Sequence, residues 1–173
     1  VEVVLELSGE GVLDVPSPRR RIGPVSLSGA PLLVGRRHQT DLHRNAVKRE
    51  CLQFLSRDHF RISLGAGGGF LLHSLTPNPI WRFRAGEPPI ELASGDDVGL
   101  LPGDCIALGT GCDDRFAGAE DARRKLSWHF SLAEQAPPTS ARANAAALDL
   151  PSPARAEAET PRAAAWRDEP SSP

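Results

Sequence analysis

Short runs of apolar residues recur along the first 132 residues of the chain, and turn-forming residues separate most of them. Within Phe60–Leu64 and Leu126–Phe130, apolar and polar positions alternate. This period of two is that of a β-strand with one buried face. We therefore expect strands at Val1–Leu7, Val25–Leu27, Leu32–Val34, Phe60–Leu64, Phe70–His73, Ile80–Phe83, Ile90–Leu92, Val98–Leu101, Cys105–Leu108 and Leu126–Leu132.

The segments between these runs favour an all-β domain. Gly65–Gly69 joins two runs and predicts a hairpin loop, and it lacks the Gly-Lys-Ser/Thr ending of a nucleotide-binding P-loop. Pro102-Gly103-Asp104 predicts a turn between two further strands. The charged stretch Gly111–Arg124 fits either a loop or a short helix. Many short, closely spaced strands indicate a sandwich or a barrel.

Composition changes near Glu134, after which Ala and Pro dominate as far as Pro173. Such a segment cannot bury enough apolar surface to offset the entropy of ordering it. We expect a folded domain over residues 1–132 and a disordered tail over 133–173. Thr160-Pro161 and Ser152-Pro153 resemble proline-directed phosphorylation sites. The tail is either an unmodified linker or, with Thr160 phosphorylated, a means of weak self-association.

The global composition narrows the class of partner. The 20 Lys+Arg and 22 Asp+Glu nearly balance, which indicates neither a nucleic-acid nor a membrane partner. No apolar run approaches the roughly 18 residues that would cross a bilayer. The three cysteines, Cys51, Cys105 and Cys112, lack a Cys-x-x-Cys spacing. We expect reduced thiols in an intracellular protein, nuclear or cytoplasmic. The chain begins with Val1 and has no Met, so we expect a part of a longer protein.

Positive charge gathers between residues 35 and 61, where seven basic residues stand against three acidic ones, a local net charge of +4. A neutral domain with its positive charge concentrated in one loop region is suited to receive an anion there. A solvated basic loop is the alternative, and charge alone does not decide between them. The basic residues are Arg36, Arg37, Arg44, Lys48, Arg49, Arg57 and Arg61.

Four short motifs follow one another in this chain. They are a strand ending in Gly-Arg (Leu32–Arg36), a Ser-x-x-His (Ser56–His59), an Asn in a turn (Leu75–Asn78) and a Gly-Asp-x-Ile-x-Leu-Gly segment within Leu101–Gly109. Their order and spacing resemble the forkhead-associated (FHA) domain family. The resemblance implies an all-β fold, a β-sandwich of two mostly antiparallel sheets, with the last strand beside the first. It also implies the binding of a phosphothreonine-containing peptide.

A phosphothreonine phosphate carries about −1.5 to −2 charges and three strong acceptor oxygens, so its site needs a fixed cation and neutral donors. By resemblance, Arg36 supplies a forked cationic donor, Ser56 a hydroxyl and Arg57 a second cation. Asn78 would hold the main chain of the peptide. Each of these also has a structural reading: Arg36 and Arg57 as solvated charges, Ser56 and Asn78 as turn residues.

The site is expected to depend on two supporting residues and to depart from the family at the Asn loop. Gly35 would allow the turn that aims Arg36, and His59 would brace the binding loops. Pro77 stands where many relatives have a hydroxyl donor, and we expect Thr76 to compensate among the phosphopeptide-binding residues. Pro79 follows Asn78, as in the FHA domains of polynucleotide kinase-phosphatase and aprataxin, and it stiffens the loop.

The resemblance therefore predicts a phosphothreonine-peptide-binding interaction module, an adaptor in phosphorylation-dependent signalling that is not an enzyme and needs no cofactor. The alternative is an FHA-like protein–protein interaction domain that does not require phosphorylation. His38, Asp41 and His43, with Cys51 nearby, are residue types that can ligate zinc. No nucleophile–base or paired-carboxylate pattern accompanies them, so we expect them to be solvated residues and the chain to hold no metal.

Overall fold

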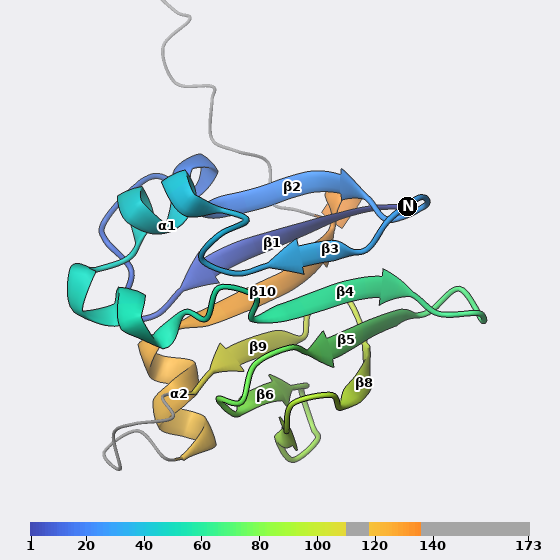
Figure 1. The fold of residues 1–173 in the computed structure, drawn as a ribbon. Helices are drawn as coiled ribbons and strands as arrows, with labels where there is room; N and C mark the ends of the chain where they lie inside the picture. Colours follow the sequence, from blue (N-terminus) through green and yellow to red (C-terminus); the bar gives the residue numbers. More distant parts are fainter. Residues whose placement is uncertain (110–117, 136–173) are drawn as a thin grey trace, which may run out of the picture. The chain divides into compact units, whose positions relative to one another are not determined.

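The computed structural model describes residues 1–109 and 118–135. Within these residues ten strands form two sheets (Figure 1): a six-stranded sheet in the order β2-β1-β10-β9-β6-β7 and a four-stranded sheet in the order β3-β4-β5-β8. Every pairing between these strands is antiparallel. The expected all-β fold of two antiparallel sheets is confirmed.

The six-stranded sheet consists of β1 (Glu2–Ser8), β2 (Arg21–Ser26), β6 (Ile80–Phe83), β7 (Ile90–Leu92), β9 (Cys105–Leu108) and β10 (Ser127–Leu132). The four-stranded sheet consists of β3 (Leu32–Val34), β4 (Phe60–Leu64), β5 (Phe70–Ser74) and β8 (Asp97–Leu100). Among the residues that the structure describes, the short α-helices α1 (Thr40–Ala46) and α2 (Ala119–Lys125) precede β4 and β10 respectively. In the same part of the chain, 3₁₀ helices cover Ser17–Arg20, Arg49–Phe54 and Ala133–Gln135.

The strands lie close to the expected positions. β10 pairs with β1, as the resemblance implied, and Gly65–Gly69 closes the hairpin between β4 and β5. β2 begins four residues earlier than expected because Arg21 and Ile22 pair with β1. The expected tail falls, from residue 136 on, outside the described residues, as does Cys112. No helix among the described residues has the length and apolar character to span a membrane.

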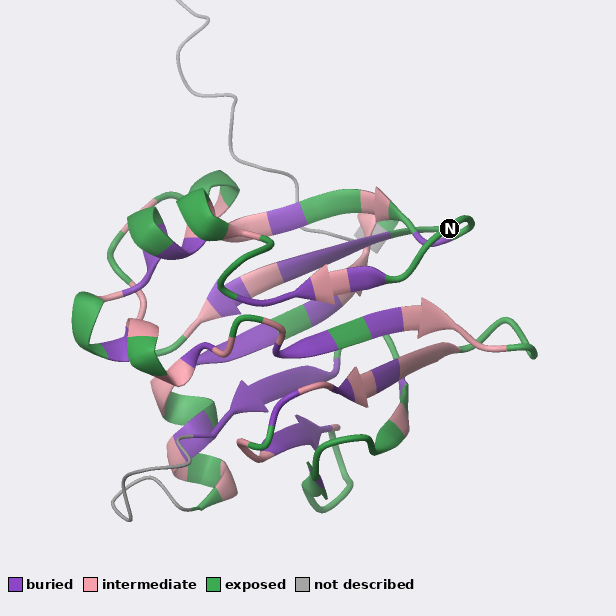
Figure 2. Ribbon diagram, viewed as in Figure 1, coloured by how far each residue is buried: buried purple, intermediate pink, exposed green. Residues whose placement is uncertain are grey.

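The core lies between the sheets and is built from the alternating positions of the strands. Phe60 and Ile62 of β4, and Trp128 and Phe130 of β10, are fully or almost fully buried, and Figure 2 shows buried segments along the strands of both sheets. Burying each such side chain stabilises the fold by about 1.5–3 kcal/mol relative to leaving it exposed. The buried side chains of the core therefore hold the two sheets against each other.

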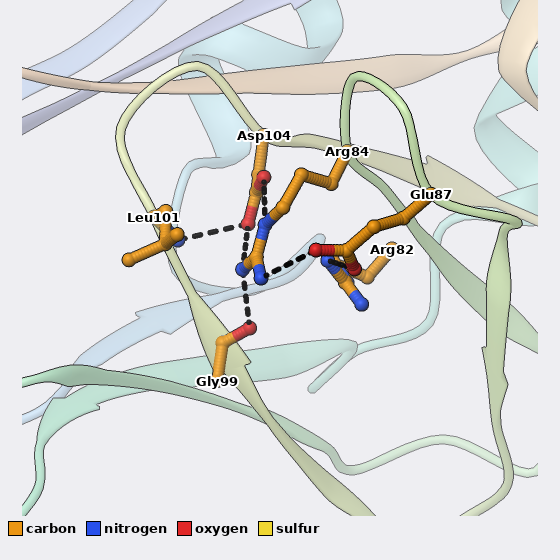
Figure 3. A network of polar contacts seen from close by, with 6 residues as sticks. All are labelled: Arg82, Arg84, Glu87, Gly99, Leu101 and Asp104. Atoms are coloured by element: carbon orange, nitrogen blue, oxygen red, sulfur yellow. Dashed lines mark hydrogen bonds and ion pairs between the residues drawn. The ribbon is translucent and has the colours of Figure 1, made fainter.

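A polar network ties the two sheets together at the turn between β8 and β9 (Figure 3). Asp104 is 1% exposed and accepts hydrogen bonds from Arg84 Nε at 2.9 Å, Arg84 Nη2 at 2.8 Å and Leu101 N at 2.8 Å. Arg84 Nη2 also donates a hydrogen bond to Gly99 O at 3.1 Å. The hydrogen bond with Asp104 is the main reason that the pKa of Arg84 is raised. Asp104, the aspartate of the fourth motif, thus has a structural role in joining the two sheets.

We predict that Asp104→Asn lowers the free energy of unfolding by about 2–3 kcal/mol, because it removes the charge from a buried acceptor of three hydrogen bonds. Urea denaturation of the two proteins measures the difference. Asp96→Asn is the matched control: Asp96 is exposed, and its carboxylate accepts a hydrogen bond from Ala93 N at 2.8 Å. A loss no larger for Asp104→Asn than for the control would contradict the structural role.

Candidate functional site

The register of the four-stranded sheet brings three chain-distant loops to one end of it. Val34 pairs with Phe60, and Phe60 pairs with Ser74. The chain therefore leaves β3, enters β4 and leaves β5 at neighbouring points (Figure 1). The segments that carry the first three motifs are these loops.

Hydrogen bonds join the three loops to one another. The Arg36 backbone N donates to Ser56 O at 2.8 Å, which links the first loop to the second. The hydroxyls of Ser56 and Thr76 lie 2.6 Å apart, which links the second loop to the third. The backbone N of Asn78 donates to Thr76 Oγ1 at 3.2 Å. The structure thus brings the loops of Arg36, Ser56 and Asn78 together.

His59 lies at the junction of all three loops and is fully buried. Its ring Nδ1 accepts from Ser56 N at 3.0 Å, its backbone N donates to Val34 O at 2.8 Å, and its carbonyl accepts from Leu75 N at 3.0 Å. Burial, with a further contribution from nearby His43, lowers the pKa of His59 to about 3. The ring is therefore neutral at pH 7, which leaves Nδ1 free to accept.

Gly35 is required by close approach rather than by a left-handed backbone. A Cβ at this position would lie 2.2 Å from the carbonyl oxygen of Arg57, so any side chain would push the first two loops apart. Gln39, which the sequence pattern did not single out, braces the same turn: its Oε1 accepts from Gly35 N at 3.0 Å and its Nε2 donates to Leu33 O at 2.8 Å. The spacing of residues in the sequence gives no signal by which the role of this glutamine could have been found.

The side chains expected to meet a ligand differ in exposure. Arg36 and Arg57 are exposed, and neither forms an ion pair with any residue that the structure describes. Arg37, by contrast, lies 2.7 Å from Asp58. Ser56 and Asn78 are partly buried. The three loops thus carry two exposed arginines that form no ion pair within the described residues, together with a partly buried serine and a partly buried asparagine.

Thr76 is a correction to the expected set of ligand contacts. Its exposed fraction is 0%, so in this structure it does not reach a ligand directly. Its hydroxyl lies instead beneath Ser56, and the exposed residue of the turn is Pro77. An alternating pattern could not reveal this, because the burial of Thr76 arises from a contact with a loop 20 residues away.

The histidines considered as zinc ligands are not a cluster of solvated residues. His43 is 1% exposed and its ring meets Trp128 edge-on, with centroids 5.9 Å apart, so the expectation of a solvated residue was wrong. His38 Nε2 lies 2.6 Å from Asp58 Oδ1, while Asp41 is exposed. Over residues 1–109 and 118–135, no three His, Cys, Asp or Glu side chains gather as a metal site would require.

A pocket of about 390 Å³ lies away from these loops, beside α2 and the adjoining ends of β1 and β10. It has both Arg123 and Arg124 and both Glu120 and Asp121 in its lining. Arg124 is already paired with Asp121 at 3.1 Å and with Glu10 at 3.4 Å. This hollow has no excess of positive charge for an anion, unlike the surface at the loops.

Comparison with known proteins gives matches only among solved structures: no family model and no curated protein matches. Fourteen chains of solved structures do. Those named here are FHA domains. The N-terminal FHA domain of S. cerevisiae Rad53p, in complex with a phosphothreonine peptide, is 19% identical with a TM-score of 0.48, covering 78% of this chain and 95% of that one.

Two further FHA structures are similar to this chain. An engineered FHA with a Myc-pTBD peptide is 18% identical, with a TM-score of 0.47, over 76% of this chain and 91% of that one. The FHA domain of human APLF, in complex with an XRCC1 bisphospho peptide, is 18% identical, with a TM-score of 0.41, over 76% and 98%. Since these TM-scores lie below 0.5, the function of this chain has to be inferred from its own residues.

We predict that the free energy of unfolding falls as the pH is lowered from 6.5 to 5.5. Burial lowers the pKa of His43 to about 4 and that of His59 to about 3, and also lowers that of His129. Below the ordinary pKa near 6.5, the unfolded chain binds protons that the folded chain does not. Each fully depressed histidine then contributes a slope of up to about 1.4 kcal/mol per pH unit.

Urea denaturation between pH 7.5 and 5.5 measures this slope in a window above the titration of ordinary carboxylates. His43→Phe preserves an aromatic ring against Trp128 and removes one titrating group, so its slope should be shallower than that of the natural chain. Stability that stays constant from pH 7.5 to 5.5, or an unchanged slope in His43→Phe, would show that these histidines are not held neutral by the fold.

Proposed function

We propose that this chain is a phosphothreonine-peptide-binding module of the FHA type, an adaptor in phosphorylation-dependent signalling rather than an enzyme. The observation that carries the proposal is the convergence of three loops, joined by hydrogen bonds through Ser56, on a surface with two unpaired arginines. The charge, the donors and the rigidity of this surface each support a phosphorylated peptide as the ligand.

The charge and donor set suit a phosphate. Arg36 and Arg57 offer two permanent cations, and a guanidinium presents parallel N–H donors that match the oxygens of a phosphate. The Ser56 hydroxyl adds a neutral donor. A phosphomonoester with nearly two negative charges gains more from this surface than a single carboxylate does. We infer that the phosphate lies over Ser56, between the two arginines.

Asn78 supports a peptide rather than a free anion as the ligand. A carboxamide both donates and accepts, so it can pair with the N–H and C=O groups of an extended main chain. Its loop is anchored on both sides: Asn78 N is held by Thr76 Oγ1, and Pro79 O accepts from Gly109 N at 2.9 Å. Gly109 itself approaches the Trp81 ring so closely that a Cβ would be 2.5 Å from it. A loop held in this way loses little entropy on binding.

We predict that Arg36→Ala weakens binding of a phosphothreonine peptide about 10- to 150-fold, because it removes charge-assisted hydrogen bonds worth about 1.5–3 kcal/mol. The peptide is selected from a degenerate library with a fixed central phosphothreonine, and calorimetry measures its affinity. Arg44→Ala is the matched control, because Arg44 is an exposed cation of α1 in the same basic segment. Its loss should be less than about threefold.

Two outcomes would contradict the proposal. Equal losses in Arg36→Ala and Arg44→Ala would reduce Arg36 to a general contribution to the positive field. Equal binding of the phosphorylated peptide and its unphosphorylated twin would favour the phosphate-independent interaction domain instead.

A further inference from the structure

The two hydroxyls at the centre of the site differ in their access to solvent. Ser56 is partly buried, whereas Thr76 is 0% exposed, and their oxygens are 2.6 Å apart. A separation this short requires one hydrogen to lie between the two oxygens. Two arrangements satisfy it: Ser56 donates to Thr76, or Thr76 donates to Ser56.

The surroundings of Thr76 distinguish the two arrangements. Thr76 Oγ1 already accepts a hydrogen bond from Asn78 N at 3.2 Å. In the described part of the chain, the acceptor within reach of the Thr76 hydroxyl hydrogen is Ser56 Oγ. If Ser56 donated, the Thr76 hydrogen would be buried without a partner, a loss of the kind that weakens a fold measurably. If Thr76 donates, both hydrogens have a place, because that of Ser56 can point outward.

We propose that Thr76 is a positioning residue that fixes the direction of the Ser56 hydroxyl. By donating to Ser56 Oγ, Thr76 turns the remaining hydrogen of Ser56 toward the surface between Arg36 and Arg57. Ser56 then meets a ligand as a donor that is already oriented before binding. This inference rests on the proposed function and deepens it: the site selects an oxyanion, whose oxygens only accept, over an unmodified threonine hydroxyl.

Pro77 increases the importance of this arrangement. It is the exposed residue of the turn, and a proline offers neither a hydroxyl nor a backbone N–H. The Thr76 hydroxyl therefore acts through its hydrogen bond to Ser56 and does not contact the ligand itself. Thr76 Oγ1 also accepts the hydrogen bond from Asn78 N. The same buried oxygen is therefore bonded to Ser56, which is proposed to lie under the phosphate, and to Asn78, which is proposed to contact the peptide main chain.

A double-mutant cycle tests whether Thr76 acts through Ser56. The variants are Thr76→Val, Ser56→Ala and the two combined, with Thr76→Ser as the conservative variant that retains the hydroxyl. Calorimetry uses the library-selected phosphothreonine peptide. We expect Thr76→Val to weaken binding about 5- to 20-fold and Thr76→Ser less than about twofold. In the Ser56→Ala background, Thr76→Val should cost less than about twofold further.

The same fold loss from Thr76→Val in both backgrounds would overturn the inference, because Thr76 would then act through Asn78 or through the general stability of the loop. Equal losses in Thr76→Val and Thr76→Ser would overturn it as well. Dispersion of the amide NMR spectrum shows which variants are folded.

A measurement on the ligand-free protein separates this inference from the proposed function. Proton NMR of the natural chain detects hydroxyl hydrogens that are protected from exchange. We expect a protected hydroxyl correlated with the Thr76 side chain. A protected hydroxyl that belongs to Ser56, or the absence of any at these two residues, would overturn the inference. If the natural chain bound no phosphothreonine peptide, the proposed function would fail, and this spectrum would still decide the direction of the hydroxyl.

Discussion

The hydrogen bond from the Ser56 backbone N–H to His59 Nδ1 holds the site together. It closes the turn that carries Ser56 and Arg57, and the same histidine is bonded through its backbone to the ends of β3 and β5. Nδ1 accepts only because the ring is neutral, and the ring is neutral because it is buried. The positions of the three loops at the surface thus depend on the low polarity of the core beneath them.

The two sheets give this arrangement its rigidity. Hydrogen bonds hold β9 at both of its ends. At its start, Asp104 accepts from Arg84 and from Leu101 N in the turn after β8, and just past its end Gly109 N donates to Pro79 O. The hydrogen bonds of Asp104 join the two sheets at the end remote from the site. The hydrogen bond between Gly109 and Pro79 fixes the Asn78 loop relative to the six-stranded sheet. Arg36 and Arg57 are exposed and form no ion pair within the described residues, an arrangement that stabilises little by itself and becomes favourable when an anion arrives.

Sequence reasoning located most of the strands and the loops that converge, because alternating apolar residues and glycine-rich turns are local signals. It did not assign α1, since Thr40–Ala46 is a single short helix whose buried face consists of His43 and Ala46. It also misjudged His43 and Thr76, and it missed Gln39. Each of these is polar in sequence, and its burial or bonding is determined by partners from distant segments, such as Trp128 for His43 and Ser56 for Thr76. Such contacts exist only once the sheets are in register.

The central claim is that three loops form one anion-binding surface, and an amide NMR titration of the isotope-labelled chain tests it most directly. The probe is a library-selected phosphothreonine peptide, with its unphosphorylated twin as the control. We expect the amides around Arg36, Ser56 and Asn78 to shift together with one binding curve, and the twin to leave them in place. Shifts confined to the pocket beside α2, or shifts at only one of the three loops, would contradict a joint surface.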